Sequence, residues 1–325
     1  MQSPLPVRDG VNATRLRLPD EGPWDTAMDY MMHRWGHIDP QGIEDRFDAG
    51  EIVGEGGAPL DRCTPLEDHT FIWYYRTLPP ETRMPVEISI LHQDEHLLVV
   101  DKPHFLPTTP GGTYIQESAL VRLRNQLNLP DLIPMHRLDR MTAGVLLLST
   151  KPETRGKYQV LFEKRQVQKE YECVSAAAPA AGFPAVGLPT VVRNRMTKSR
   201  SYLLAEVIEG EPNAETRIEL LRTFDGGAHD GGTARLALYR LEPHTGKTPQ
   251  LRVHMASLGL GIVNDAFYPE LLDKAPDDYS KPLQLLARGI RFVDPISKQP
   301  VEYRSRLELS EALPASRSLT YAGFF

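Results

Sequence analysis

One stretch of this 325-residue chain decides its fold: His136-Arg137-Leu138-Asp139-Arg140-Met141-Thr142-Ala143-Gly144-Val145-Leu146-Leu147-Leu148. The second half of the stretch is a short apolar run, which predicts a fully buried strand. The first half places a carboxylate, Asp139, at the polar turn directly before that strand. An ionised carboxylate is costly to remove from water, so it is normally paired, hydrogen-bonded or shifted in pKa. The pattern predicts that rigid backbone holds Asp139 at the edge of a core.

Further elements are expected around this stretch. Strands are predicted at 86–92, 97–103 and 168–174, and a helix at 152–164 that begins at Pro152 and turns Val160 and Leu161 inward. Strands and helices do not alternate strictly along the chain. We therefore expect an α+β fold, with a mixed, mostly antiparallel central sheet and flanking helices.

The N-terminal part has a different organisation. Residues 1–22 are predicted to be a flexible tail. Residues 23–76 are predicted to be a small α/β module, with a helix near 25–35 that Gly36 ends, a second helical piece near 42–47 and short strands. Residues 77–85 are rich in Pro, Glu and Thr and are expected to be a linker, and 86–325 to form the main domain.

Bulk composition limits the class of protein. The chain has 25% charged residues, no apolar run of about 20 residues and no signal-peptide layout, so a cytoplasmic protein without a membrane partner is expected. Its two cysteines, Cys63 and Cys173, indicate neither a disulfide framework nor a zinc site. The sequence contains no Gly-rich phosphate loop, and no cofactor is expected.

The net charge of −6 is unevenly distributed. Residues 1–85 carry 8 arginines, no lysine and 15 acids, whereas the other 240 residues have a net charge of +1. Residues 188–204 contain four basic residues and no acid: Arg193, Arg195, Lys198 and Arg200. This stretch is either a solvated surface loop or a strip that contacts phosphates.

A second segment supplies a possible partner for Asp139. Residues 246–259 predict a helix with Thr248 as its N-cap, Pro249 at its first position and Gly259 after its end. Arg252 would lie one turn into that helix, from where it could reach Asp139. A positive charge at that distance would keep the aspartate ionised.

Together these segments resemble the RluA-type RNA pseudouridine synthases. The resemblance covers about residues 88–305, and it rests on the phrase at 136–148, on Lys169-Glu170-Tyr171, on 246–254 and on a closing strand near Leu283–Ala287. An opening phrase that ends in Lys102-Pro103 also matches. The module at 23–76 resembles in architecture the alpha-L RNA-binding module often fused to these synthases, although it is acidic.

The resemblance implies an isomerase with the pseudouridine synthase fold. It implies that Asp139 is the catalytic aspartate, as nucleophile at ribose C1′ or as base at C2′, that Tyr171 stacks on the target base and that Arg252 keeps Asp139 anionic. Arg137 would fill the gap left by the flipped nucleotide. The other residues expected to contact RNA are His136, Arg140, Lys169, Lys247, Gln250, Arg193, Arg195, Lys198 and Arg200. The implied partner is a structured ribosomal or transfer RNA, and a monomer is expected.

This chain departs from the family pattern at a few positions. Lys247 and Pro249 stand where the family usually has Arg and His, Ala143 replaces a Ser, and Leu286 replaces a His and is expected to wall the base pocket. The changes at 247 and 249 leave an alternative open, namely a catalytically weak or inactive RNA-binding or ribosome-associated protein on the same scaffold.

Two other kinds of site fit the sequence less well. A hydrolase of nucleosides or glycans would need two acids about 5–9.5 Å apart, and only one acid stands in a motif. His136, Asp139 and His254 could be read as metal ligands, but their spacing offers no third histidine and an arginine near the carboxylate would repel a cation. A metal site is not expected.

Overall fold

The computed structural model describes residues 3–177, 187–198, 204–229, 232–272 and 277–313. The chain divides into two compact units. The smaller unit comprises the residues up to Arg83 together with 110–117 and 121–130, and the larger one comprises the rest. The first boundary, after Arg83, falls inside the segment expected to be a linker. Within the described ranges no helix has the length and apolar character needed to cross a membrane.

The smaller unit contains two helices and a two-stranded ribbon. Its elements are β1 (Thr14–Arg17), α1 (Ala27–Trp35), α2 (Pro40–Asp48), the short 3-10 helix Leu66–Asp68 and β2 (Phe71–Tyr74). Helix α1 begins with a capping box, in which the Thr26 side chain and the Asp29 carboxylate each bond the other residue's backbone N–H, and it ends at Gly36. The two predicted helices of this region are confirmed.

The prediction of a flexible tail over residues 1–22 is wrong for its second half. Strand β1 pairs antiparallel with β2, with Leu16 opposite Ile72. Leu16 and Leu18 are buried in the core of this unit, whereas Arg15 and Arg17 are exposed. The alternation of leucine and arginine lets a short strand bury one face, and the tail-like composition of the preceding residues masked that signal.

The larger unit is built around one sheet of eleven strands. Its strands are β3 (Ser89–Gln93), β4 (Leu97–Lys102), β5 (Ile133–Pro134), β6 (Ala143–Ser149), β7 (Gln168–Ala176), β8 (Thr190–Lys198), β9 (Ala205–Ile208), β10 (Ala214–His229), β11 (Gly232–Pro243), β12 (Leu285–Val293) and β13 (Pro300–Arg304). Its helices are α4 (Pro152–Glu163), α5 (Gln250–Ser257) and the 3-10 helix Ser310–Ala312, while α3 (Ala119–Leu127) contributes residues to both units.

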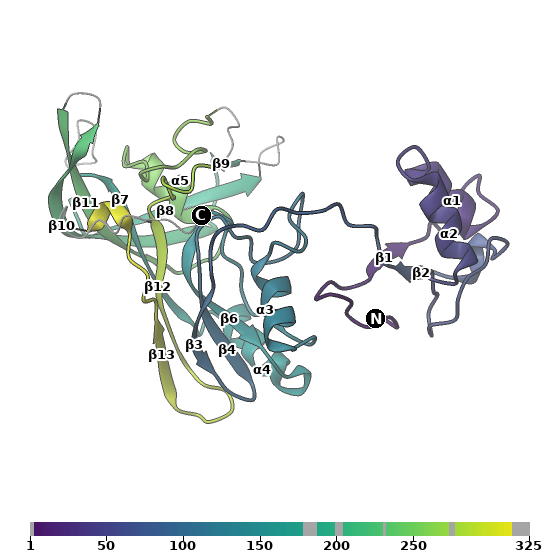
Figure 1. The fold of residues 1–325 in the computed structure, drawn as a ribbon. Helices are drawn as coiled ribbons and strands as arrows, with labels where there is room; N and C mark the ends of the chain where they lie inside the picture. The colour runs from purple at the N-terminus through teal and green to yellow at the C-terminus, as the bar shows by residue number, and fades with distance from the viewer. Residues whose placement is uncertain (1–2, 178–186, 199–203, 230–231, 273–276, 314–325) are drawn as a thin grey trace. The chain divides into compact units, whose positions relative to one another are not determined.

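The strand order is β3-β4-β6-β12-β7-β11-β10-β8-β9, with β5 paired to β6 and β13 to β12 (Figure 1). Among the described strands, β6 and β12 form a parallel pair and all other pairs are antiparallel. The predicted mixed, mostly antiparallel α+β fold is thus confirmed. The parallel pair joins the strand after Asp139 to the late strand β12.

The central strands are apolar because both of their faces are covered. All seven residues of β6 and all six of β4 are buried. Helix α4 begins with Pro152 at its first turn, as predicted, and packs on this part of the sheet through Tyr158, which is 1% exposed. Val160 is 37% exposed, so its predicted inward orientation is wrong, whereas Leu161 does pack on the core.

Candidate active site

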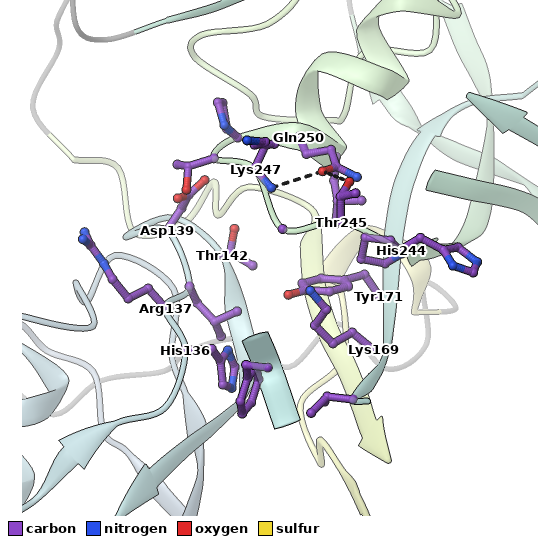
Figure 2. A pocket seen from close by; sticks show the side chains of 18 of the residues that line it. His136, Arg137, Asp139, Thr142, Lys169, Tyr171, His244, Thr245, Lys247 and Gln250 are labelled. Carbon is purple, nitrogen blue, oxygen red and sulfur yellow. Dashed lines mark hydrogen bonds between the residues drawn. The ribbon is translucent and has the colours of Figure 1, made fainter. Parts of the chain in front are cut away.

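A pocket of about 690 Å³ lies in the larger unit (Figure 2). Its walls come from the loop before β6, the start of β7 and the loop that leads into α5. The three residues that the sequence assigned to catalysis, Asp139, Tyr171 and Arg252, all line it. The fold therefore brings three segments that are far apart in the chain to one cavity.

The backbone around Asp139 is fixed on both sides. Before it, the Thr108 hydroxyl donates to the Leu138 carbonyl at 2.8 Å and accepts from the Leu138 N–H at 3.1 Å. After it, Gly144 has a φ of 112°, and a Cβ there would lie 2.3 Å from the carbonyl oxygen of Ala287. Glycine allows this close approach, which seats β6 against β12 directly after the turn.

The charge of Asp139 is set by opposing effects. Its side chain is 30% exposed, and its Oδ2 lies 4.0 Å from Nη1 of Arg252. Burial raises the pKa of Asp139, while the positive charges of Arg252, Lys102 and Arg137 lower it. Burial prevails, so the pKa is raised from its usual range. The predicted approach of Arg252 is confirmed, but its charge only partly offsets the cost of burial.

Arg252 is held more closely by Asp265, which the sequence did not single out. The Arg252 Nε donates to Asp265 Oδ2 at 2.7 Å, and Nη2 donates to Oδ1. The Asp265 side chain is fully buried, and its Oδ1 also accepts from the N–H groups of Phe267 and Tyr268. Two-point binding fixes the guanidinium plane and leaves Nη1 for Asp139. A lone aspartate in a turn gave no sequence signal of this role.

Lys102, at the end of β4, is a second cation near Asp139. It is fully buried, and its ammonium donates to the carbonyls of Pro103 at 2.8 Å, Leu106 at 2.7 Å and Arg140 at 3.3 Å. Burial lowers the pKa of Lys102 to about 7, while the charge of Asp139 opposes the shift. The sequence marked this residue only as part of the opening phrase. The structure shows that it ties the Asp139 loop to β4.

Tyr171 reaches the pocket from β7. Figure 2 shows Tyr171 and Lys169 on one side of the cavity and Asp139 on the other, as the two-residue period of a strand requires for neighbours on one face. Burial and the nearby charge of Asp139 raise the pKa of Tyr171, so its hydroxyl stays protonated. Its ring is thus a neutral surface on the side of the cavity opposite Asp139.

The opposite face of β7 is held by ion pairs on either side of Tyr171. Arg304 of β13 donates to Glu170 at 3.0 Å, and Arg288 of β12 binds Glu172 through two nitrogens at 2.8 and 2.6 Å. The side chains of Glu170 and Glu172 are 16% and 13% exposed. These pairs tie β7 to β12 and to β13 near the point where the pairing register between β7 and β12 shifts.

Gln250 differs from its predicted role as an RNA contact. It is 3% exposed, and its oxygen accepts from the Thr245 hydroxyl at 2.6 Å and the Lys247 N–H at 3.1 Å. Its amide nitrogen donates to the Glu215 carbonyl at 2.9 Å and the Thr216 hydroxyl at 2.8 Å. These four bonds use its full capacity, so Gln250 anchors the loop before α5 to β10.

His254 extends that anchor and does not face the pocket. It is fully buried, with Nδ1 2.8 Å from the Thr216 hydroxyl and Nε2 3.0 Å from Asn194 Oδ1. Burial lowers its pKa to about 4, so the ring is neutral. Within the described residues no group of three His, Cys, Asp or Glu side chains could hold a metal ion.

The predicted start of α5 is shifted by one residue. Pro249 is the N-cap, Gln250 is the first helical residue and no side chain caps the N-terminus, so Thr248 is not the N-cap. The Gln250 side chain bonds the Lys247 N–H and so satisfies a donor of the loop before the helix. Gly259, with a φ of 70°, follows the end of the helix as predicted.

Arg140 is turned away from the pocket, contrary to its predicted RNA contact. Its two terminal nitrogens each lie 2.8 Å from an oxygen of Asp277, and it does not line the cavity. An arginine next to the catalytic aspartate suggested phosphate binding, but successive residues of a turn point in different directions. Here the arginine braces the Asp139 loop.

The remaining predicted RNA contacts fall into two groups. Arg137 and Lys247 are exposed and line the pocket, and His136 and Lys169 line it while partly buried. Arg193, Arg195 and Lys198 lie exposed on β8 and do not line it, and Arg193 pairs with Glu215 at 2.7 Å. Arg200 lies outside the described residues. A role for the β8 residues in RNA binding stays a prediction.

Some residues that line the pocket were not predicted to do so from the sequence. Leu285 lines the cavity, whereas Leu286, the predicted wall residue, is 1% exposed in the core on the other face of β12. Only the strand's orientation could decide between the two neighbours. Further lining residues that the sequence did not indicate are Thr109, Phe162, Glu163, Arg165, His244 and Thr245.

Known proteins are similar to this chain in sequence. The family model for RNA pseudouridylate synthase matches residues 96–257. The dual-specificity RNA pseudouridine synthase RluA of Salmonella typhi is 33% identical over 212 residues, covering 64% of this chain and 88% of that protein. Ribosomal large subunit pseudouridine synthase C of Vibrio cholerae is 30% identical over 256 residues, covering 74% of each chain.

A solved structure agrees at the level of the fold. Human RNA pseudouridylate synthase domain containing 1 superposes with a TM-score of 0.53 at 21% identity, covering 70% of this chain and 86% of that chain. The fold, the matched sequence and the pocket that holds the predicted catalytic residues all agree. The chain therefore belongs to the RluA-type family of RNA pseudouridine synthases.

Proposed function

We propose that this chain converts specific uridines of a structured ribosomal or transfer RNA to pseudouridine, without a cofactor, and that Asp139 is its catalytic residue. The observation that carries this proposal is the meeting of Asp139, Tyr171 and Arg252 at one pocket. Asp139 is the lining acid held by fixed backbone, with two buried cations acting on it, Arg252 and Lys102.

The reaction exchanges one bond of uracil for another. The N1–C1′ bond breaks, the uracil turns, a C5–C1′ bond forms, C5 loses its proton and N1 gains one. As nucleophile, the Asp139 carboxylate attacks C1′ while uracil leaves with the bonding electrons, and C5 later displaces the carboxylate. As base, Asp139 takes the C2′ proton to give a glycal and returns it on rejoining. Both routes require the ionised carboxylate, which Arg252 and Lys102 favour.

The neighbouring side chains serve the detached base and the RNA. The target nucleotide must leave the helix, because a stacked base hides its glycosidic bond. Tyr171 offers a neutral ring on which the uracil can stack, a contact worth about 1–3 kcal/mol per base. Arg137 is exposed at the rim of the pocket, where it can occupy the gap left in the helix.

The charge pattern supports RNA as the ligand despite the acidic chain. Besides Arg252, four cations line the pocket: Arg137, Arg165, Lys169 and Lys247. Within the described part of the chain, no carboxylate oxygen lies within 4.0 Å of the charged nitrogens of these four side chains. Phosphates respond to local potential in a cleft and not to net charge, so the acidic smaller unit does not oppose this role.

The test is pseudouridine mapping of total RNA by carbodiimide labelling and primer extension, in cells with and without the gene. We expect one or more sites to vanish with the gene and to return with the wild type but not with Asp139→Asn. That variant keeps the shape of the side chain and removes its charge, so it should still bind RNA. Near-normal turnover by Asp139→Asn would refute the mechanism. No change at any site would favour an RNA-binding protein without activity, with Lys247 and Pro249 as the first positions to revert.

A further inference from the structure

The wall of the pocket around Lys169 carries charge that the chemistry at Asp139 does not use. The Lys169 side chain is partly buried and points into the cavity beside Tyr171 (Figure 2). Burial lowers the pKa of Lys169, as expected for a cation taken from water without a counterion. A buried ammonium with no acid partner among the described residues is costly unless a ligand supplies the negative charge.

The neighbours of Lys169 on this wall cannot neutralise it. The His136 Nε2 accepts from the Leu147 N–H at 3.2 Å, and its ring stacks on Phe162 at 5.2 Å. Burial and the charge of Lys169 lower the pKa of His136 to about 3, so the imidazole is uncharged. This part of the pocket is a fixed neutral surface next to an unpaired cation.

Arg165 adds a second cation to the lining of the same cavity. It follows the end of α4, is exposed and lines the cavity. Glu163 also lines the cavity, but it is exposed and lies more than 4.0 Å from both basic groups. The wall therefore offers two donors of positive charge that reach toward one cavity.

The cations on the other face of β7 do have acid partners. There the Glu170 carboxylate lies between Arg304 at 3.0 Å, Arg240 at 3.8 Å and Arg291 at 3.9 Å. Arginines on that face are compensated within the protein. Lys169, on the pocket face of the same strand, has no such partner among the described residues.

We infer that Lys169 and Arg165 form an oxyanion subsite of this pocket, which binds the backbone phosphate of a nucleotide next to the target uridine. The inference rests on the proposed function, because it takes RNA as the ligand of the cavity. Ammonium and guanidinium groups are the usual partners of phosphate oxygens, and they bind them through charge-assisted hydrogen bonds.

The experiment measures binding of one RNA transcript as a function of salt, together with steady-state kinetics. Each phosphate contact contributes about 0.7–0.9 to the slope of log K against log salt concentration. Lys169→Gln and Arg165→Gln should each reduce the slope by nearly one contact and raise KM more than they lower kcat. Lys169→Arg should restore the slope. The matched control is Lys157→Gln, which removes an exposed lysine of α4 that does not line the pocket.

The outcomes show whether Lys169 and Arg165 bind a backbone phosphate or the anion of the detached uracil. A fall in kcat at saturating RNA with an unchanged slope in Lys169→Gln would assign the oxyanion to the detached uracil and overturn the phosphate subsite. A slope and KM equal to those of the wild type, in a variant whose thermal unfolding is unchanged, would also overturn it. Binding needs no turnover, so a slope that falls in Lys169→Gln would support the subsite even if the wild type made no pseudouridine.

Discussion

Removing the charge of Arg252 should move the acidic limb of the pH–rate profile to higher pH. Activity requires the Asp139 carboxylate, so it is lost as pH falls through the folded-state pKa of that group. Burial raises this pKa, and Arg252 is the first of the charges that oppose the rise. In Arg252→Gln that opposition is lost, the pKa rises further and activity begins to fall at a higher pH.

The distance sets the size of the shift. Two unit charges 4 Å apart interact by about 4 kcal/mol at an effective dielectric constant of 20, and Arg252 Nη1 lies 4.0 Å from Asp139 Oδ2. The Asp139 side chain is 30% exposed, so water screens part of this attraction. About 1–2 kcal/mol of attraction between Arg252 and Asp139 then remains. Since one pKa unit corresponds to about 1.4 kcal/mol, the limb should move by about one unit.

Arg252→Lys is the matched variant, because it keeps the charge and loses the two-point contact with Asp265. It should retain the position of the limb while kcat falls. Arg252→Gln also leaves Asp265 buried without its partner, which costs about 3–5 kcal/mol of stability. Circular dichroism must therefore show that each variant is folded across the pH range.

The assay is kcat/KM for pseudouridine formation on a defined transcript, from about pH 4 to pH 8, for the wild type and both variants. The reasoning is refuted if the limb of Arg252→Gln coincides with that of the wild type. It is refuted equally if Arg252→Lys shifts as far as Arg252→Gln, because the effect would then come from geometry and not from charge.

Three further predictions concern the scaffold of the site. Gln250→Leu should lower the free energy of unfolding, measured by chemical denaturation, by about 1–3 kcal/mol, because its buried partners lose their hydrogen bonds. The salt slope of RNA binding should stay unchanged. Unchanged stability with a reduced salt slope would instead identify Gln250 as an RNA contact. Glu170→Gln should lower the free energy of unfolding by about 1–2 kcal/mol and lower kcat, because the strand that carries Tyr171 loses the ion pairs of Glu170. A fall in thermal stability with kcat preserved would show that these ion pairs do not position Tyr171. Gly144→Ala should destabilise the fold by at least about 3 kcal/mol in denaturant titration, because its Cβ would meet the Ala287 backbone at a positive φ. A loss of less than about 1 kcal/mol would show that β6 and β12 can move apart to accept the methyl group.

Local pattern was sufficient where one short segment determines its own structure. The short apolar run after Asp139 favours a buried strand, and all seven residues of β6 are buried. Pro152 begins α4 because a first-turn residue needs no N–H partner. The motif positions Asp139, Tyr171 and Arg252 were found because each lies in a phrase of fixed spacing, and all three reach the pocket.

Local pattern failed where a side chain had more than one available partner. Arg140 and Gln250 carry the polar groups expected of RNA contacts, yet one pairs with Asp277 and the other satisfies all its hydrogen bonds inside the protein. Asp277 is 137 residues from Arg140 along the chain, a separation beyond any motif.

The sequence alone indicated the class of fold, the family and Asp139 as the candidate catalytic carboxylate, because these depend on short segments with strong hydrophobic and motif signals. The tertiary structure was needed to show that Lys102 also acts on Asp139, that Asp265 orients Arg252, that Leu285 and not Leu286 lines the pocket, and that among the described residues no carboxylate oxygen lies within 4.0 Å of the Lys169 ammonium. These features depend on distance and burial between segments remote in the chain, and electrostatic energies are fixed by such distances.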